Sequence, residues 1–336
     1  MHEIRIGIVG TGMIAQVIAR ASQRAEGVKL YAVASREQAR AVAFAQTHGA
    51  VVAYAEWQAL VEDPQVDAVY VATPTAGRET ICLAAIARGK HLISEKPFLN
   101  AASARRIASA ARDAGVAFMD ATHFTHHPRT VTVRHHLAER LGGAQRLATA
   151  FFFPFDDRNN IRFDPRSEPS GAIGDMGWYS MRAIVEYLQP QGLPQQVVGA
   201  LRRDGQTNAI VGGSGMMLFA DGRSSLFDFG YDAGVCQMDL NILGSTGLIQ
   251  LDDFVLDWKE GFTFDNPAHL TGFVERQGMS TPEQFTRIAT PASKPQASLM
   301  LEGFTQLVRQ PEQRNTAAER TVLTQTLLDA FTAVVA

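Results

Sequence analysis

The chain places the stretch Gly10-Thr11-Gly12-Met13-Ile14-Ala15 directly after a short apolar run, Ile4–Val9, and at the start of a helical pattern. A glycine loop between a first strand and a first helix is the context of a dinucleotide-binding fingerprint. Gly10 permits the tight turn, and Gly12 lets the backbone approach a pyrophosphate whose oxygens accept hydrogen bonds from the helix start. A glycine turn without a dinucleotide is the competing interpretation, because the pattern alone is weakly specific.

The remainder of residues 1–122 repeats this alternation of strands and helices. Its apolar runs are rich in Val and Ile and lack an in/out alternation, as expected for strands that are buried on both faces. Ala-rich helical stretches separate them. Strands that alternate with helices predict a parallel, doubly wound sheet. The predicted strands are Ile4–Val9, Val28–Ala34, Val51–Tyr54, Ala68–Ala72, His91–Ser94 and Val116–Met119.

After Thr122 the strands become longer and follow one another with few helices between them. Asp221-Gly222 lies between two of these runs and is a signal for a tight hairpin. We predict an α/β protein with a Rossmann dinucleotide-binding domain over residues 1–122. An α+β domain over residues 123–336 follows, built on one large, mostly antiparallel sheet. Its strands are predicted near 145–153, 197–203, 209–219, 224–229 and 237–243, and the main helices near 128–141, 172–188, 297–308 and 317–335.

Composition narrows the class of protein. A length of 336 residues suggests two domains, and 46% hydrophobic with 19% charged residues is ordinary for a globular protein. The formal net charge of -3 gives no sign of a nucleic-acid surface. No apolar run is long enough to span a membrane, and no secretory signal is visible. Cys82 and Cys236 lack metal-ligand spacing, so we expect reduced thiols in a cytoplasmic protein.

The end of the second predicted strand bears on the choice of cofactor. An NAD-selective site usually has an acidic residue there to accept from the ribose 2′-hydroxyl. This chain has Ser35 followed by Arg36, and a guanidinium suits the 2′-phosphate of NADP. We therefore expect NADP. NAD stays an alternative because Glu37 comes next, and a solvated surface arginine is the competing interpretation of Arg36.

Two further motifs follow buried strands. Thr73-Pro74 ends the fourth strand, and Ser94-Glu95-Lys96-Pro97 ends the fifth. Open α/β sheets bind their ligands beyond the carboxyl ends of the strands, so a lysine at this place indicates chemistry on the ligand. Taken alone, Lys96 is better explained as an ordinary solvated lysine before the next helix.

These motifs, together with Gly171-Ala172-Ile173-Gly174-Asp175-Met176-Gly177-Trp178-Tyr179, make the chain resemble the Gfo/Idh/MocA family of oxidoreductases. Met119-Asp120-Ala121 and Ile161-Arg162-Phe163-Asp164-Pro165 are similar to stretches in its dihydrodiol dehydrogenase and glucose–fructose oxidoreductase-like branch. The resemblance implies that Lys96 lies beside the nicotinamide and the substrate, and that Asp175 and Tyr179 complete the catalytic site. It also implies a homodimer or homotetramer formed through the sheet of the second domain.

The fingerprint and the resemblance together predict a set of cofactor contacts. All of them lie in loops that follow the first, second, fourth and fifth strands. They are Gly10, Thr11, Gly12, Met13, Ile14, Ser35, Arg36, Thr73, Pro74, Thr75, Glu95 and Lys96.

The proposed catalytic residues also make chemical sense. Asp175 and Tyr179 are spaced i, i+4, which puts them on one face of a regular helix. A free tyrosine has a pKa near 10 and is a poor base at neutral pH, but a neighbouring ammonium such as that of Lys96 favours its phenolate. The competing interpretations are a helix-dipole role for Asp175 and a core aromatic role for Tyr179.

Several stretches depart from the family pattern. Arg78 replaces a histidine that is usual near that helix start, which puts the family's contacts there in doubt. The segment His123-Phe124-Thr125-His126-His127-Pro128 has no carboxylate or cysteine at ligand spacing, so we expect no metal. His123 follows the last parallel strand and is a candidate substrate contact. The polar loop before the Asp175 helix offers three more, Asp157, Asn160 and Arg162, although a solvated loop is an equal alternative.

The expected function is that of an NAD(P)-dependent oxidoreductase. It would interconvert a hydroxyl and a carbonyl on a sugar, a polyol or a dihydrodiol-like small molecule, with Tyr179 as acid and base and Lys96 assisting. Two alternatives stay open: a non-catalytic dinucleotide or sugar sensor of the same fold, and a reductase of a C=N bond. The sequence chooses neither the substrate nor the direction of the reaction.

Overall fold

A computed structural model describes residues 3–259 and 264–335 of the chain. The chain forms two compact units. The first takes residues up to His123 and then Lys294–Val322, and the second takes Phe124–Ser293 and the residues from Leu323 onward. The single domain boundary expected after residue 122 therefore misses a return of the chain to the first unit.

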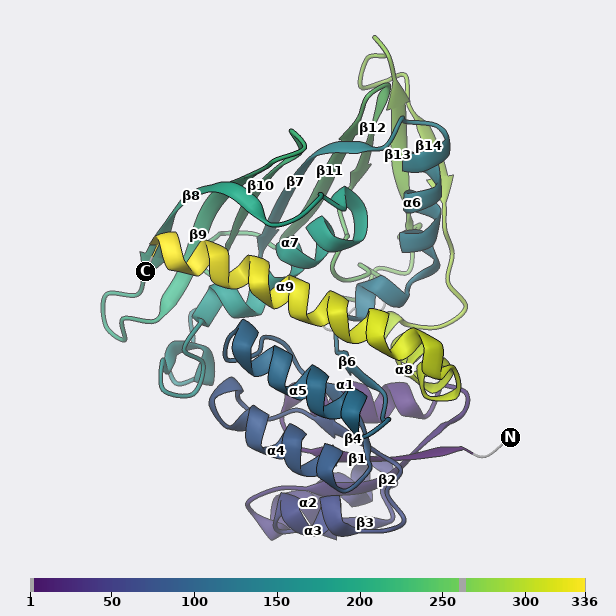
Figure 1. Cartoon of the computed structure of the whole chain (residues 1–336), viewed down its shortest axis with the longest axis vertical. Coiled ribbons are helices and arrows are strands. Elements are labelled where there is room, and N and C mark those ends of the chain that lie inside the picture. Colours follow the sequence, from purple (N-terminus) through teal and green to yellow (C-terminus); the bar gives the residue numbers. More distant parts are fainter. Residues whose placement is uncertain (1–2, 260–263, 336) are drawn as a thin grey trace. The chain divides into compact units, whose positions relative to one another are not determined.

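The first unit is built on a six-stranded parallel sheet with helices on both faces (Figure 1). The strand order is β3-β2-β1-β4-β5-β6, so the chain builds outward from β1 in one direction and then in the other. Right-handed crossovers then put α1 and α2 on one face and α3, α4 and α5 on the opposite face. The strands are β1 Ile4–Val9, β2 Val28–Ala34, β3 Val52–Tyr54, β4 Ala68–Val71, β5 His91–Ser94 and β6 Phe118–Asp120. The helices are α1 Met13–Ser22, α2 Gln38–His48, α3 Trp57–Glu62, α4 Thr75–Ala87 and α5 Ala101–Asp113.

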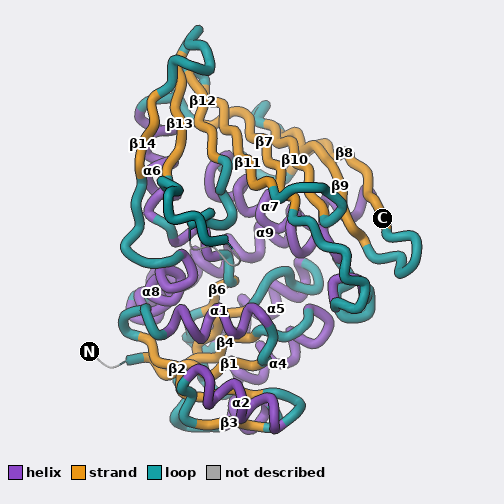
Figure 2. The backbone as a smooth tube through the Cα atoms, turned by 180° about the vertical axis from the view of Figure 1, so that it is seen from behind, coloured by secondary structure: helices purple, strands orange, loops and turns teal. Residues whose placement is uncertain are grey.

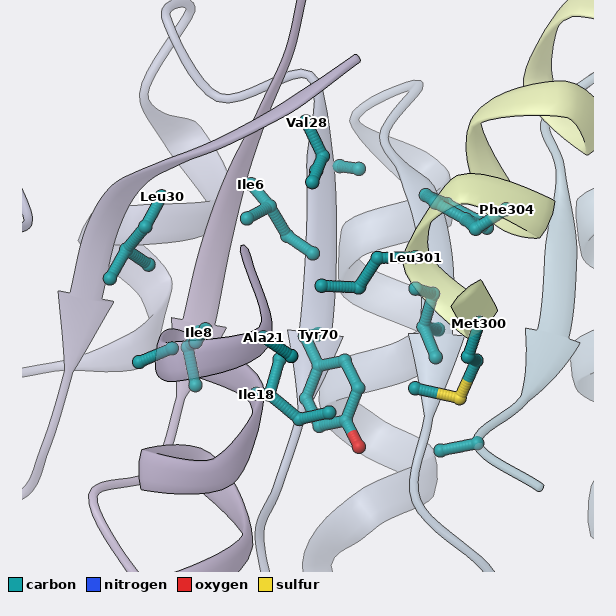
Figure 3. Packing of buried hydrophobic residues seen from close by; sticks show 14 of the residues in the cluster. Ile6, Ile8, Ile18, Ala21, Val28, Leu30, Tyr70, Met300, Leu301 and Phe304 are labelled. Carbon is teal, nitrogen blue, oxygen red and sulfur yellow. The ribbon is translucent and has the colours of Figure 1, made fainter. Parts of the chain in front are cut away.

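The returning segment adds a helix, α8 Gln296–Arg309, to the core of this unit. Met300, Leu301 and Phe304 of α8 pack in one buried cluster with Ile6 and Tyr70 of the sheet (Figure 3). Phe304 is fully buried, and truncation of such a side chain to alanine costs about 3–5 kcal/mol. The placement of this helix in the second domain was wrong, because an apolar helical stripe shows that a face is buried but not against which sheet.

The second unit is built on an eight-stranded sheet of order β14-β13-β12-β11-β7-β10-β9-β8 (Figure 2). Neighbouring strands are antiparallel except for β7 and β10, which pair in parallel at the centre. The predicted fold class, a Rossmann sheet plus a large and mostly antiparallel sheet, is confirmed. The strands are β7 Ala144–Phe152, β8 Pro194–Arg203, β9 Ile210–Phe219, β10 Ser224–Gly230, β11 Gln237–Gly244, β12 Gly247–Leu251, β13 Gly272–Gln277 and β14 Thr286–Ala289.

Helices cover one face of the second sheet. The segment expected as one helix near 172–188 is α7 Trp178–Ala183 between two π-helical turns, Ile173–Gly177 and Ile184–Leu188. In Figure 1, α7 and the end of α9 Arg314–Val335 lie on the same side of this sheet. Among the described residues of this unit the other α-helix is α6 Pro128–Glu139. The predicted hairpin is present, with Gly222 at φ +80° between β9 and β10.

Polar and apolar side chains line the opposite face of this sheet. In register across β8, β9, β10 and β7 lie Val198, Met216, Leu226 and Ala148. Leu226 is 55% exposed and Val198 is 44% exposed. The pairing thus aligns these four side chains into an apolar row, which we call the sheet stripe. Among the described residues no helix is both long and apolar enough to cross a membrane.

Candidate functional site

In the first unit, the loops that carry the predicted cofactor contacts and Lys96 all begin at the carboxyl ends of the strands, at the same height in the sheet. The pairing registers align Ala34, Val9, Val71, Ser94 and Asp120 in a single row across β2, β1, β4, β5 and β6. The loops that carry the motifs begin immediately after this row. The sheet therefore brings together side chains that lie more than eighty residues apart in the sequence.

The glycine loop is shaped for a ligand that approaches its backbone. Gly10 has φ +114°, and a Cβ there would lie 2.9 Å from the carbonyl oxygen of Ala72. At Gly12 no described atom lies within 4 Å of a Cβ position, so the Cα faces open space. Gly12 is also the N-cap of α1, and no described side chain caps the N–H groups of that helix. These donors and the open approach fit the pyrophosphate of a dinucleotide.

The strand-end residues after β2 differ in their surroundings. Ser35 lies beside the glycine loop, because its Oγ accepts from Thr11 Oγ1 at 3.4 Å. Arg36 is exposed and makes no hydrogen bond or ion pair within the described part of the chain. Glu37 pairs with Arg40 at 3.6 Å, so the nearest acidic side chain already has a cationic partner.

The two loops that follow β4 and β5 are joined by a buried side chain. Arg78, in the first turn of α4, donates to the carbonyl oxygens of Thr73, Glu95 and Pro97. Its exposed fraction is only 4%. Sequence reasoning noted this arginine as a departure from the family but assigned it no role. Thr75 is buried at the start of the same helix.

Lys96 sits in a loop whose backbone is held by its neighbours. Its backbone N–H donates to Glu95 Oε2 at 3.3 Å, and the other oxygen of that carboxyl group accepts from the Tyr70 hydroxyl. Burial raises the pKa of Glu95. The Lys96–Pro97 peptide bond is cis.

His123 lies at the same sheet edge, just after β6. Its Nδ1 donates to Gln296 Oε1 at 2.9 Å. Burial lowers the pKa of His123 to about 4, and the positive charge of Lys96 contributes to the shift. The histidine is therefore neutral at physiological pH. Its sensitivity to Lys96 is consistent with the expectation that both serve one site.

In the second unit, Tyr179 stands on α7 within an aromatic cluster. Its ring packs edge-on to Phe151 with centroids 5.4 Å apart, and tilted against Phe124 at 6.3 Å. The tyrosine is 7% exposed. These contacts fix the direction of the ring and therefore the place of its hydroxyl.

Asp175 belongs to the π-helical turn before α7 rather than to a regular α-helix. Its Oδ2 accepts from Arg162 Nε at 2.7 Å and from the Tyr231 hydroxyl at 3.0 Å. Asp175 raises the pKa of the Arg162 guanidinium, and burial raises the pKa of Tyr231 well above its usual value. Sequence reasoning placed Asp175 in the catalytic site but missed Tyr231, which has no motif around it.

The other two candidates in the polar loop shape the chain around Arg162. Asn160 Oδ1 accepts from the backbone N–H of Arg162 at 3.2 Å and begins the 3-10 turn Ile161–Phe163. Asp157 Oδ1 accepts from the backbone N–H of Asn159 at 3.0 Å. Both contacts are internal to the loop. The guanidinium of Arg162 also lies over the Phe155 ring, 5.4 Å from its centroid.

Three histidines of the second unit, His127, His136 and His269, take part in structural contacts. His127 Nδ1 accepts from the backbone N–H of Arg129 at the start of α6, and His136 pairs with Glu275 at 2.6 Å. Asp253, Asp257 and His269 bring ligand-type atoms within 4.8 Å of one another. Arg129 forms a buried ion pair with Asp253, and His269 bonds the other oxygen of that carboxylate. This group is therefore an ion-pair network around one acid.

Comparison with known proteins identifies the class. Residues 4–122 match the model of an oxidoreductase family with an NAD-binding Rossmann fold, GFO_IDH_MocA. A dTDP-3,4-didehydro-2,6-dideoxy-alpha-D-glucose 3-reductase of Actinomadura kijaniata is 29% identical over 98% of this chain and 95% of its own length. A trans-1,2-dihydrobenzene-1,2-diol dehydrogenase of Macaca fascicularis is 32% identical over 54% of this chain and 55% of its own.

Among solved structures, the 3-ketoreductase KijD10 of Actinomadura kijaniata, in complex with NADP and TDP-benzene, superposes with a TM-score of 0.87. The two sequences are 25% identical, and the match covers 99% of this chain and 98% of that one. The chain belongs to the Gfo/Idh/MocA family of oxidoreductases, and its first unit is an NAD(P)-binding Rossmann domain.

Because the charge of Lys96 contributes to the low pKa of His123, a change at Lys96 should alter that pKa, and this can be measured without a substrate. Replacing Lys96 by methionine removes a positive charge, so the pKa of His123 should rise above about 4, while burial, the larger cause, still holds it below its ordinary value. Nuclear magnetic resonance titration of the imidazole signals measures this shift, and Lys90→Met is the matched control. A pKa that does not move in Lys96→Met would contradict the placement.

The same histidine contributes to acid sensitivity. Its pKa is lower in the folded than in the unfolded state, so between about pH 6.5 and pH 4 the unfolded state binds more protons. Stability should therefore fall as the pH is lowered through that window. His123→Gln should show a smaller loss in urea unfolding at pH 4.5 relative to pH 7.

Proposed function

We propose that this protein is an NADP-dependent oxidoreductase that interconverts a carbonyl and a hydroxyl group on a sugar-like substrate. The observation that carries the proposal is the position of Lys96 at the same carboxyl edge of the sheet as the glycine loop. A cationic side chain there can contact the reacting groups of the cofactor and the substrate, while the loop at Gly10 binds the phosphates of the dinucleotide. The dinucleotide supplies or accepts the hydride when it is bound.

The preference for NADP rests on Arg36. The side chain is exposed at the end of β2, where a dinucleotide of this fold places its adenosine ribose. Glu37, which would favour NAD, is already paired with Arg40. An arginine makes charge-assisted bonds to phosphate oxygens, so it favours the 2′-phosphate over a hydroxyl. The complex of the similar ketoreductase with NADP supports the same choice.

Tyr179 and Lys96 carry out the proton transfer in this proposal. In the reductive direction the carbonyl carbon gains the hydride, and the carbonyl oxygen gains a proton from the Tyr179 hydroxyl. The ammonium of Lys96 hydrogen-bonds the same oxygen and favours the phenolate that the tyrosine leaves behind. Solvent then returns the proton to Tyr179. In the oxidative direction the same phenolate takes the proton of the substrate hydroxyl.

The group around Asp175 supports a sugar-like substrate. Arg162 and Asp175 form an ion pair at 2.7 Å whose side chains are 32% and 25% exposed. Such a pair offers hydrogen-bond donors and an acceptor but no net charge. It therefore suits a neutral ligand such as the hydroxyl groups of a sugar better than an anionic ligand. The similar reductase named for a dTDP-linked keto sugar supports a nucleotide-linked keto sugar as the first substrate to test.

We also propose that the protein is a homodimer or homotetramer that assembles through the second sheet. The sheet stripe of Val198, Met216, Leu226 and Ala148 runs across four strands and is partly exposed. A second copy of the same sheet would cover it, because an apolar row in register is complementary to itself when two sheets pack face to face.

Coenzyme selectivity tests the role of Arg36. We expect NADPH to quench tryptophan fluorescence at lower concentration than NADH. Arg36→Ala should weaken NADPH binding about 10- to 100-fold, the value of a charge-assisted hydrogen bond, and should leave NADH binding nearly unchanged. Arg88→Ala, which removes an exposed arginine that pairs with Glu62 and takes no part in the predicted cofactor contacts, is the control. Equal affinities of the two coenzymes in the unmodified protein would contradict the assignment.

A substrate panel tests the catalytic roles. Nucleotide-linked keto sugars, aldoses, polyols and dihydrodiols are assayed by the absorbance of NADPH. Tyr179→Phe should lower kcat about 10²- to 10⁴-fold, the range for loss of a general acid, and Lys96→Ala should abolish turnover. Tyr187→Phe is the matched control, because Tyr187 is buried nearby and bonds Thr130. Unchanged rates in both site variants would remove these residues as catalysts, and tight coenzyme binding without turnover would favour a sensor.

The assembly is tested by light scattering on a sizing column. The unmodified chain should elute at two or four times 36.6 kDa. Leu226→Arg should shift it toward one chain, because a charge in the middle of an apolar contact is not solvated. Leu270→Arg, at an exposed leucine outside the sheet stripe, should leave the mass unchanged. A monomeric unmodified protein would reject the proposal.

A further inference from the structure

Arg78 occupies a place that elementary electrostatics disfavours. It lies in the first turn of α4, where the partial positive charge of the helix end repels a cation. It is also 4% exposed, so its charge is removed from water. A buried guanidinium in such a position persists only if other groups compensate both costs.

The compensation comes from three backbone carbonyl groups on two different loops. Arg78 Nε and Nη2 donate to Thr73 O at 3.2 and 2.6 Å, and Nη1 donates to Glu95 O at 2.9 Å and also to Pro97 O. The planar fork of an arginine suits this task, since its donors point in fixed directions and it stays charged. A single side chain thus links the loop after β4 to the loop after β5.

The two carbonyl groups on the second loop stand on either side of Lys96. The backbone N–H of Lys96 is held as well, because it donates to Glu95 Oε2 at 3.3 Å. The other oxygen of Glu95 is anchored by the hydroxyl of Tyr70, which is fully buried in β4. The peptide unit before Lys96 is therefore held at its carbonyl group by Arg78 and at its N–H by Glu95, and Arg78 also holds the carbonyl group of Pro97, one residue further on.

We propose that Arg78 is a positioning residue that sets the backbone of Lys96 relative to the Thr73-Pro74 loop. Its hydrogen bonds within the described residues all go to backbone carbonyl groups, and it acts through those of Glu95 and Pro97. The importance of Lys96 for turnover rests on the proposed function. The link between Arg78 and Lys96 rests on geometry alone, so the two can be tested separately.

The test uses the small number of lysines in this chain, which are Lys29, Lys90, Lys96, Lys259 and Lys294. Reductive methylation with ¹³C-labelled formaldehyde gives each lysine a nuclear magnetic resonance signal, and Lys96→Arg identifies the signal of Lys96. In the unmodified chain, NADP⁺ should shift this signal. In Arg78→Gln the Lys96 signal should move without coenzyme, and its response to NADP⁺ should fall to less than half. The signals of Lys29 and Lys294 should stay in place.

Arg106→Gln is the matched control, because Arg106 is an exposed arginine that pairs with Glu79, the neighbour of Arg78 on α4. It should leave all five signals unchanged. Arg78→Lys keeps the positive charge but not the planar fork, and it should also displace the Lys96 signal. An unchanged Lys96 signal in folded Arg78→Gln would overturn the proposal. Unfolding of both Arg78 variants would overturn it too, since Arg78 would then support the whole unit.

Turnover gives the second measurement. With an active substrate from the panel, Arg78→Gln should lower kcat about tenfold or more and change KM less than threefold, because small displacements of a reacting group cost rate rather than binding. A KM effect with unchanged kcat would overturn the proposal. If the unmodified protein turns over no substrate, the proposed function fails, while the lysine signals still decide the role of Arg78.

Discussion

The strands of the first sheet all run in the same direction, and the site depends on this constraint. Parallel strands end at a common edge, so the residues after β1, β2, β4, β5 and β6 emerge side by side. The pairing registers of neighbouring strands align the last residues of these strands in one row. The row consists of Ala34, Val9, Val71, Ser94 and Asp120. The loops need no long reach, because the sheet already gathers them.

Within each unit, polar groups of the candidate site are held by pairing rather than by exposure to water. Glu95 is bonded by Tyr70, and Asp175 is bonded by Arg162 and Tyr231. Buried polar groups are stable only when they are paired, and pairing removes their freedom to reorient. Each unit thus holds these side chains in a fixed direction. For an oxidoreductase this matters, since hydride and proton must reach the same carbonyl group.

The predictions from sequence were accurate where one local pattern decided the structure. The Rossmann strands, the Asp221-Gly222 hairpin and the large second sheet follow from periodicity and turn chemistry over a few residues each. Strands β12, β13 and β14 were missed, because Gly247–Leu251, Gly272–Gln277 and Thr286–Ala289 are short and lack a strong alternation. The helix expected near 172–188 is interrupted by π-helical turns, which periodicity does not reveal.

By itself, the sequence determined the fold class, the family and the identity of the candidate residues Lys96, Asp175 and Tyr179, since glycine turns, strand ends and motifs are local properties of a chain. Only the tertiary structure decided which partners these residues have. The return of α8 to the first core, the pairing of Asp175 with Arg162 and the bonds of Arg78 on both sides of Lys96 join residues that no local pattern relates. Such contacts are chosen by packing, which depends on the whole chain.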